Sequence, residues 1–416
     1  MASEPTLGDR WASIVAAELR SLTPAPESIS RAVAEIVARV RREGDAAVAD
    51  YTEKFDTAGH PAPPLRVTEE ELSAAEETLD AAVSDALRAA FRNVYEVAQA
   101  GISEPQAVAD ATREIVLREA PVQRAAVYAP GGRAPYPSTV VMGVAAAKAA
   151  GVTEVVVCSP PEVDPAILAA CRLTGASEMY RMGGAQAIAA LAYGTETVRP
   201  ADVIVGPGNL YVQEAKRQVS DRVAIDGFAG PSDLMVIVEE DVSDLNAIVL
   251  DLLAQAEHGA GTVVVAVSTS PVVVEQLTGA LTGAQTDAVI RLEHAPTLEE
   301  ALELAEAFAP EHLQLAGASA EALAPRVTKA GCLFVGADTG TAFGDYIVGS
   351  NHILPTNGSA RFTSGLSAAQ FRRRFAEVRI LEAAPLARRA APLARAEGFE
   401  LHAQSMEARI RDNRDQ

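Results

Sequence analysis

Apolar residues recur every three to four positions from about residue 28 to residue 100, and this spacing predicts amphipathic helices. It is clearest in SRAVAEIVARV and in EEELSAAEETLDAAVSDALRAAF, which the proline-rich segment HPAPPL separates. We therefore expect a helical N-terminal region over residues 1–120, with no visible chemistry of its own.

From about residue 125 the pattern changes to short apolar runs that alternate with alanine-rich, helix-length stretches. A first series contains the runs AAVYA, EVVVCS, EMYRM and DVIVG, and a second contains DLMVIVEED, TVVVAVS, HLQLAG and CLFVGA. Runs this apolar are typical of strands buried on both faces, and helix-length connections are typical of parallel strands. We predict an α/β fold with two tandem, incomplete Rossmann-like parallel-sheet units, over residues 121–235 and 236–340.

The regular alternation stops after residue 337. Residues 338–367 are rich in Gly, Ser, Asn and Thr, and a loop this long in a folded chain usually has a function. Helical spacing returns near the end, in LARAEGFELHAQSMEARIRD. Residues 341–416 are therefore expected to form an active-site loop and a small C-terminal helical segment.

Charge and length exclude some classes of function. The 416 residues are too many for one ordinary core, and 56 acidic against 35 basic residues give a net charge of −21. This balance argues against nucleic acid or an anionic membrane as a partner, because both attract basic surfaces. Apolar stretches stay far short of the ~20 residues that span a bilayer, so we expect a cytoplasmic protein.

The three cysteines, Cys158, Cys171 and Cys332, share no C-x-x-C spacing and lie in apolar contexts such as VVVC and GCLFV. We interpret them as buried free thiols rather than disulfides or a zinc knuckle.

The segment DLLAQAEHG places Gln255 and His258 three residues apart on a predicted helix, so both project from one face. Two side chains at this spacing can reach one metal ion. Alternatively, His258 caps the end of its helix and Gly259 supplies the left-handed turn. From this segment alone, the capping interpretation is favoured.

Further candidate groups come later in the chain. Glu311 and His312 in PEHLQL are the residue types of an acid–base pair, although a surface Glu beside a half-buried His is an equally simple interpretation. Asp345 and His352 lie in the long loop, and His402 lies five residues after Glu397. Imidazole, carboxylate and amide donors suit a divalent ion such as zinc.

Three glycine-rich turns, APGG, MGGAQ and VGPGN, each follow a predicted strand and precede a predicted helix. Ligands bind at the carboxyl ends of such strands, and helix N-termini bind phosphate. Any one of these turns is better explained as a tight connection. Three in succession on one sheet favour a nucleotide.

Eight motifs in this order resemble the histidinol dehydrogenase family over about residues 120–405: YAPGGRAPYPSTVVM, GGAQAIAALAYGTETV, VGPGNLYVQEAK, AGPSDL, LLAQAEHG, PEHLQL, GDYIVGSNHILPT with ARFTSGLS, and EGFELHAQS. The resemblance implies a zinc-dependent, four-electron oxidation of L-histidinol to L-histidine through histidinaldehyde, with two NAD, as the last step of histidine biosynthesis. It also implies a homodimer, in which the C-terminal segment contributes to the neighbouring subunit's site.

The resemblance further implies a role for each matching residue. One zinc per subunit would be held by Gln255, His258, Asp345 and His402. His312 would be the general base, and Glu311 would activate water for the second oxidation. NAD would contact Tyr128, Gln186 and Asn209. The substrate would contact Ser232, Gln255, His258, His312, Asp345, His352, Glu397 and His402.

Two alternatives remain open at this point. One is a related dehydrogenase that oxidises another hydroxylated molecule, such as a sulfonated or phosphorylated diol. The other is a catalytically silent protein that binds zinc or a nucleotide. The chain also departs from the family pattern in TGTAFGDY and at Phe399 of EGFELH, which bears on substrate preference. No cysteine lies in the eight motifs, which argues against a thiohemiacetal route.

Overall fold

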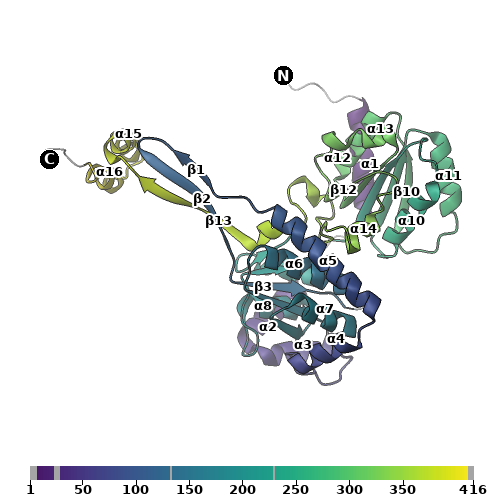
Figure 1. Ribbon diagram of the computed structural model, residues 1–416, viewed down its shortest axis with the longest axis horizontal. Coiled ribbons are helices and arrows are strands. Elements are labelled where there is room, and N and C mark those ends of the chain that lie inside the picture. The colour runs from purple at the N-terminus through teal and green to yellow at the C-terminus, as the bar shows by residue number, and fades with distance from the viewer. Residues whose placement is uncertain (1–6, 23–28, 132–133, 228–229, 411–416) are drawn as a thin grey trace. The chain divides into compact units, whose positions relative to one another are not determined.

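The computed structural model describes residues 7–22, 29–131, 134–227 and 230–410. The chain divides into two compact units, the first comprising Met1–Gly101 with Val122–Phe371 and the second Ile102–Pro121 with Arg372–Gln416. Figure 1 labels the helices and strands of both units.

The first sheet belongs to the first unit, and all its strand pairs are parallel. In the described part of the chain it has five strands in the order β5-β4-β3-β6-β7. The strands are β3 (Arg124–Tyr128), β4 (Glu154–Ser159), β5 (Glu178–Arg181), β6 (Val203–Val205) and β7 (Ala224–Ile225). Its connecting helices are α6 (Pro137–Ala149), α7 (Pro165–Thr174), α8 (Gly184–Tyr193) and α9 (Leu210–Val219).

The second sheet, also in the first unit, repeats this arrangement. Its five described strands run in the order β10-β9-β8-β11-β12 and are again parallel. They are β8 (Asp233–Val238), β9 (Val263–Ser268), β10 (Val289–His294), β11 (His312–Ala316) and β12 (Cys332–Val335). The helices that follow them include α10 (Leu245–Ala256), α11 (Pro271–Leu281), α12 (Leu298–Phe308), α13 (Ala318–Glu321) and α14 (Thr341–Tyr346). The predicted α/β fold with two parallel sheets is confirmed.

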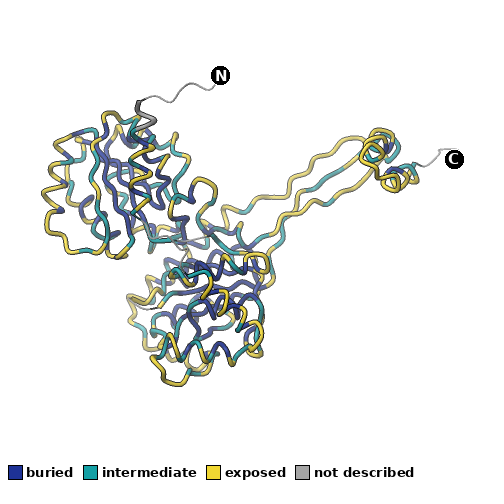
Figure 2. The backbone as a smooth tube through the Cα atoms, turned by 180° about the vertical axis from the view of Figure 1, so that it is seen from behind, coloured by how far each residue is buried: buried dark blue, intermediate teal, exposed yellow. Residues whose placement is uncertain are grey.

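The central strands of both sheets are fully buried, as their continuous apolar runs predict. Figure 2 shows this as dark blue concentrated in the two sheets. Each strand carries helices on its faces, and small residues such as the alanines of α8 let those helices approach closely.

The N-terminal helices complete the helical layers of these sheets and form no core of their own. Helix α1 packs on α12, and its residues Ala12, Ala16 and Leu19 join the core of the second sheet. Helices α2 and α3 pack on α8 of the first sheet, α4 packs on α7 and α5 on α6. The N-terminal helices are α1 (Leu7–Ser21), α2 (Ser30–Glu43), α3 (Asp45–Phe55), α4 (Glu69–Thr78) and α5 (Ala81–Ala100).

The second unit contains an antiparallel sheet in the order β1-β2-β13, followed by two helices. Its elements are β1 (Gln106–Ala109), β2 (Arg113–Pro121), β13 (Arg372–Ile380), α15 (Ala383–Ala396) and α16 (Glu400–Glu407). The helical region expected to reach residue 120 therefore ends at Ala100, and two strands follow it. These strands carry mostly exposed or half-buried residues, so they lack the alternating buried stripe by which a strand is recognised. The predicted C-terminal helices are present.

No helix of the described ranges is long and apolar enough to cross a membrane.

Candidate active site

The carboxyl group of Glu311 and the ring of His312 lie at the amino-terminal edge of the second sheet. His312 is the first residue of β11 and pairs in register with Leu234, the second residue of β8. Helix α10 follows β8 and runs back toward this edge, which places its last turn beside the two strand starts. The predicted acid–base pair and the predicted ligand pair Gln255 and His258 thus come from neighbouring elements.

A chain of hydrogen bonds joins these groups. The amide Nε2 of Gln255 donates to Ser232 Oγ, and Ser232 Oγ donates in turn to Glu311 Oε2. Glu311 and Asp233 are also joined twice: the backbone N–H of Asp233 donates to Glu311 Oε2 at 3.1 Å, and the backbone N–H of Glu311 donates to Asp233 Oδ1 at 2.7 Å. The amide nitrogen of Gln255 is therefore engaged, which turns its oxygen toward other partners.

His312 lies between two carboxylates. Its Nδ1 is 3.7 Å from Glu311 Oε2, and its Nε2 is 3.5 Å from Asp345 Oδ1. The Nδ1 atom is buried and has no hydrogen-bond partner among the described residues. A buried ring nitrogen without a partner costs free energy, so this atom is suited to exchange a proton with a bound molecule.

Burial and neighbouring charges shift the pKa values of both Glu311 and His312. Burial raises the pKa of Glu311 to about 7, and the nearby His312 cation opposes part of this rise. Burial alone would lower the pKa of His312, but the carboxylates of Glu311 and Asp345 outweigh it and raise the pKa to about 9. The pKa of Glu311 thus lies near neutral pH, whereas that of His312 lies above it, so the pair can hold and pass on a proton.

His258 is exposed at the end of α10. Loss of hydration lowers its pKa, and the carboxylate of Asp345 partly offsets this change. Its ring makes no hydrogen bond to the described residues and so does not cap the helix, although Gly259 does take the left-handed conformation at φ 83°.

His352 connects the two sheets of the first unit. Its Nε2 lies 3.1 Å from the hydroxyl of Thr139 at the start of α6, and its Nδ1 lies 3.0 Å from the backbone oxygen of Asp345. The neighbouring Asn351 donates to the carbonyl of Met142 at 3.1 Å. The long loop thereby brings the edge that carries Asp345 next to the helix that follows the first glycine-rich turn.

The remaining two candidates, Glu397 and His402, lie on the second unit. Both are exposed, Glu397 at the end of α15 and His402 on α16. The ring of His402 packs against Phe399, with centroids 5.2 Å apart. The described residues contain no group of three His, Cys, Asp or Glu side chains arranged to hold a metal.

The three glycine-rich turns follow β3, β5 and β6, at the carboxyl edge of the first sheet as expected; Gly132 of APGG lies outside the described residues. Tyr128 is buried at the end of β3, and its hydroxyl accepts from the N–H of Gly184 at 3.2 Å. Gln186 donates to Asp56 at 3.0 Å. Asn209 is exposed and caps α9 through the N–H of Val212 at 3.1 Å.

Sequence reasoning missed several polar residues at these sites. Asp56 and Arg20 belong to the region expected to carry no chemistry, yet Asp56 bonds Gln186 and Arg20 forms an ion pair with Asp233 at 2.6 Å. Neither residue lies in a recognisable motif. Asp233 lies in AGPSDL beside Ser232, so that motif is the one signal that could have found it.

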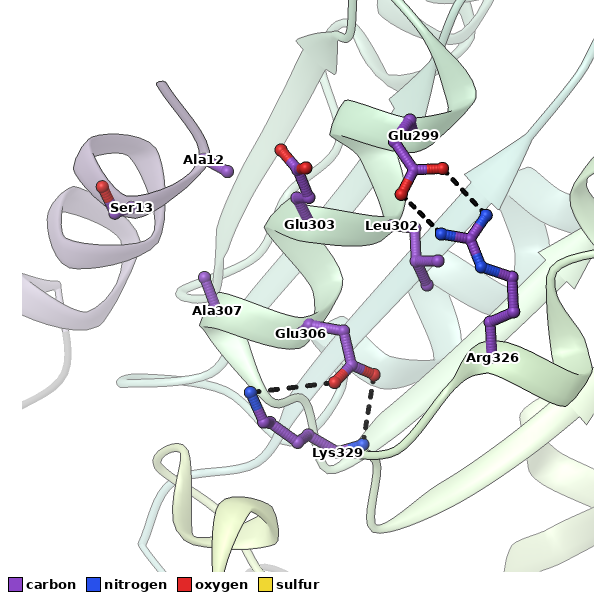
Figure 3. A pocket seen from close by; sticks show the side chains of 9 residues that line it. All are labelled: Ala12, Ser13, Glu299, Leu302, Glu303, Glu306, Ala307, Arg326 and Lys329. Atoms are coloured by element: carbon purple, nitrogen blue, oxygen red, sulfur yellow. Dashed lines mark hydrogen bonds and ion pairs between the residues drawn. The ribbon is translucent and has the colours of Figure 1, made fainter. Parts of the chain in front are cut away.

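A separate hollow of about 370 Å³ lies between α1 and α12 and contains none of the predicted site residues. Figure 3 shows four of its five charged side chains paired with one another, Glu299 with Arg326 and Glu306 with Lys329. These exposed ion pairs leave it without the convergent polar groups of a catalytic pocket.

The free cysteines do not provide a nucleophile. Cys158 and Cys171 are fully buried, and burial raises the pKa of both thiols. Cys332 is half-buried on β12, and burial raises its pKa too. Thiolates, which are the reactive form, are therefore suppressed at all three positions.

The two parallel α/β sheets, the glycine-rich turns at the carboxyl edge of the first and the buried Glu311–His312 pair at the second suit an NAD-dependent oxidoreductase. The histidinol dehydrogenase family model matches residues 21–410, and the chain belongs to this family. It therefore catalyses the conversion of histidinol to histidine in histidine biosynthesis.

Individual relatives agree with this assignment. The chain is 40% identical to the histidinol dehydrogenase of Brucella suis over 403 residues, which cover 92% of this chain and 93% of the relative. It is equally similar to that of Rhizobium meliloti, with 95% of each chain covered. The crystal structure of histidinol dehydrogenase from Elizabethkingia anophelis matches with a TM-score of 0.88 and 30% identity, over 98% of this chain and 96% of that chain.

Proposed function

We propose that this chain oxidises L-histidinol in two NAD-linked steps through histidinaldehyde, with Glu311 and His312 as its acid–base pair and a zinc ion at the same site. The carrying observation is the hydrogen-bonded connection from Gln255 through Ser232 to Glu311, beside the contact of His312 with Asp345. It joins two of the candidate ligands, Gln255 and Asp345, to the candidate proton-transfer groups.

The donor chemistry suits zinc. Gln255 offers an amide oxygen because its nitrogen already donates to Ser232, and His258 offers a ring that makes no cap. Asp345 adds a carboxylate, and His402 of the second unit adds a second imidazole. When bound, zinc would supply a positive charge that orients the amine and imidazole of the substrate.

His312 is proposed as the general base. In the first oxidation it takes the hydroxyl proton while the carbinol hydride passes to NAD, which leaves the aldehyde. The carboxylates of Glu311 and Asp345 on either side of the ring stabilise the cation that forms.

Glu311 is proposed to act in the second oxidation. As a carboxylate it removes a proton from the water that adds to the aldehyde, and the hydrate then gives its hydride to a second NAD, which leaves the carboxylate of histidine. A carboxyl group with a pKa near 7 can accept that proton and release it again. The step uses no thiol, since burial suppresses the reactive thiolate at all three cysteines.

The remaining candidate residues are proposed to contact the substrate and the cofactor. Ser232, His352 and Glu397 are proposed to bind the polar ends of histidinol, together with the ligand and acid–base residues. Tyr128, Gln186 and Asn209 are proposed to contact NAD, since they line the carboxyl edge of the first sheet, where α/β folds bind dinucleotides.

The second unit supports a homodimer. Its strands and helices expose large apolar side chains that nothing within that unit covers: Val108, Leu117, Phe375, Val378, Ile380, Leu393, Phe399 and Leu401. Exposed apolar surface of this extent is typical of an interface. We propose that a second copy of the chain covers it and that Glu397 and His402 serve the partner's site.

The free cysteines fit a reducing compartment such as the cytoplasm.

The test is an assay of purified protein with zinc, NAD and L-histidinol. We expect about two NADH per histidine, because the conversion of an alcohol to a carboxylate releases four electrons and each NAD takes two. Metal analysis should find about one zinc per chain, and less in a His258→Ala variant. Turnover of another alcohol without turnover of histidinol, or zinc-free protein with full activity, would contradict the proposal.

A further inference from the structure

Arg20, near the end of α1, makes three kinds of contact with the segment that leads into the acid–base pair. Its guanidinium lies over the ring of Phe308, 3.6 Å from the centroid. It donates to the backbone oxygens of Phe308 and of Ala309, the latter at 3.1 Å. Its Nη1 also forms the 2.6 Å ion pair with Asp233. One side chain thus binds both the end of α12 and the start of β8.

The end of α12 has a backbone that needs such support. Ala309 adopts the left-handed conformation, with φ 49° and ψ 68°, although it is not a glycine. Non-glycine residues keep this conformation only where the surroundings fix it. The guanidinium binds the two carbonyl oxygens at this turn, and only Pro310 separates Ala309 from Glu311.

Asp233 carries the effect of Arg20 onto Glu311 itself. One carboxylate oxygen of Asp233 accepts from Arg20 and the other accepts from the backbone of Glu311, while the backbone of Asp233 donates to the Glu311 carboxylate. Asp233 is buried, with its side chain only 1% exposed. Without the guanidinium, this buried carboxylate would lose the cation that fixes it beside Glu311.

We propose that Arg20 is a positioning residue for the oxidation of the aldehyde. By binding the carbonyl oxygens at the end of α12 and the carboxylate of Asp233, it holds the Glu311 carboxylate where it can deprotonate the water that adds to the aldehyde. The inference rests on the role proposed above for Glu311. His312 also contacts Asp345 through its other ring nitrogen, so we expect the first oxidation to depend less on Arg20.

The experiment supplies the full-length, zinc-loaded enzyme with NAD and either L-histidinol or histidinaldehyde. The variant Arg20→Met keeps much of the volume and removes the donors. We expect the rate of aldehyde oxidation to fall about tenfold to a hundredfold, as for a misplaced catalytic group, and the first oxidation to fall far less. The matched control is Arg326→Met, which removes an exposed ion pair with Glu299 of α12. It should leave both rates unchanged.

Loss of folding stability alone would lower both rates together, so an equal loss in the two steps, or no loss, overturns the proposal. If Arg20→Met does not fold, Arg20→Lys provides the same test. Lysine keeps the ion pair with Asp233 but cannot bind both carbonyl oxygens at the end of α12, so the rate of aldehyde oxidation should fall while the rate of the first oxidation does not. Glu311→Gln is assayed in parallel. An unchanged aldehyde step in that variant refutes the role of Glu311 itself, whatever Arg20 does.

Discussion

Glu311 and His312 are neighbours in the sequence, yet different residues hold them. Glu311 is bound by Asp233, the first residue of β8, and by Ser232 just before it, whereas His312 faces Asp345 of α14. This separation allows the two groups to perform different proton transfers, and it makes their roles separable by substitution.

Replacing His312 with Asn keeps a polar side chain of similar size and removes the base. We expect both oxidations to slow by about 10²–10⁴-fold, since this is the usual loss when a general base is removed. Steady-state rates with histidinol and with histidinaldehyde provide the measurement. A loss confined to one step would show that His312 is not the base for both.

Replacing Glu311 with Gln should leave the first oxidation largely intact and stall the second. Histidinaldehyde would then accumulate, and the yield would approach one NADH per histidinol consumed. Trapping the aldehyde with a hydrazine reagent detects it directly. Complete conversion to histidine at the normal rate would remove Glu311 from the mechanism.

Asp56 offers a test of pH dependence away from the proposed metal ligands. Burial raises its pKa to about 6, against the hydrogen bond from Gln186. A raised folded-state pKa means that stability is lost as the pH rises from about 4 through 6. An Asp56→Asn variant avoids this loss, so its melting temperature should exceed that of the unchanged chain above pH 6, and the difference should vanish near pH 4. A difference in melting temperature that does not change with pH would contradict the raised pKa of Asp56.

The sequence allowed the PEHL pair to be proposed because both residues are contiguous. It could not reveal Arg20, Asp56 or Asp233 as partners, because their contacts join positions from 78 to 289 residues apart and follow from the packing of α1 and α3 on the sheets.

At the scale of elements, the strongly apolar strands and alanine-rich helices were predictable because burial on both faces leaves a continuous signal. The short edge strand β7, with two residues, and the exposed strands of the second unit were not. Strands β2 and β13 are joined by cross-strand ion pairs such as Arg118 with Glu377 and Arg379 with Glu114. Alternating charges of this kind resemble a solvated surface rather than a sheet.

The VGPGN turn after β6 is fixed by a fully buried lysine on α9. Lys216 Nζ donates to the Gly206 carbonyl at 2.5 Å and to Asp226 at 2.6 Å, and Asp226 accepts from the Gly206 N–H at 2.7 Å. A Cβ on Gly206 would lie 2.1 Å from the Tyr128 carbonyl oxygen. The turn that presents Asn209 therefore has little freedom.

Replacing Lys216 with Met should leave Asp226 as an unpaired buried charge and lower the free energy of unfolding by about 3–5 kcal/mol. The double variant Lys216→Met, Asp226→Leu should be less destabilised. Urea unfolding measures both. We also expect the KM for NAD to rise more than kcat falls in the single variant; equal stability of the single variant and the unchanged chain would show that the pair is not structural.

At the scale of the whole molecule, the proposed dimer predicts complementation between two inactive chains. His258→Ala lacks a ligand on the first unit, and His402→Ala lacks one on the second. In a mixed dimer with exchanged C-terminal segments, one of the two sites is intact, so random mixing should restore about a quarter of the normal activity. Mixtures with no gain over the separate variants would contradict a shared site.

The contacts of Arg20 also bear on where a minimal enzyme can begin. The family model matches the chain from residue 21 onward, one position after Arg20, whose guanidinium binds the carbonyl oxygens at the end of α12. An expression boundary drawn at that limit would preserve every motif and still remove the side chain that supports Glu311. A protein trimmed to residues 21–416 would also lose the core residues Ala12, Ala16 and Leu19 of α1, so we expect it to be less stable and to oxidise the aldehyde more slowly than the full chain does.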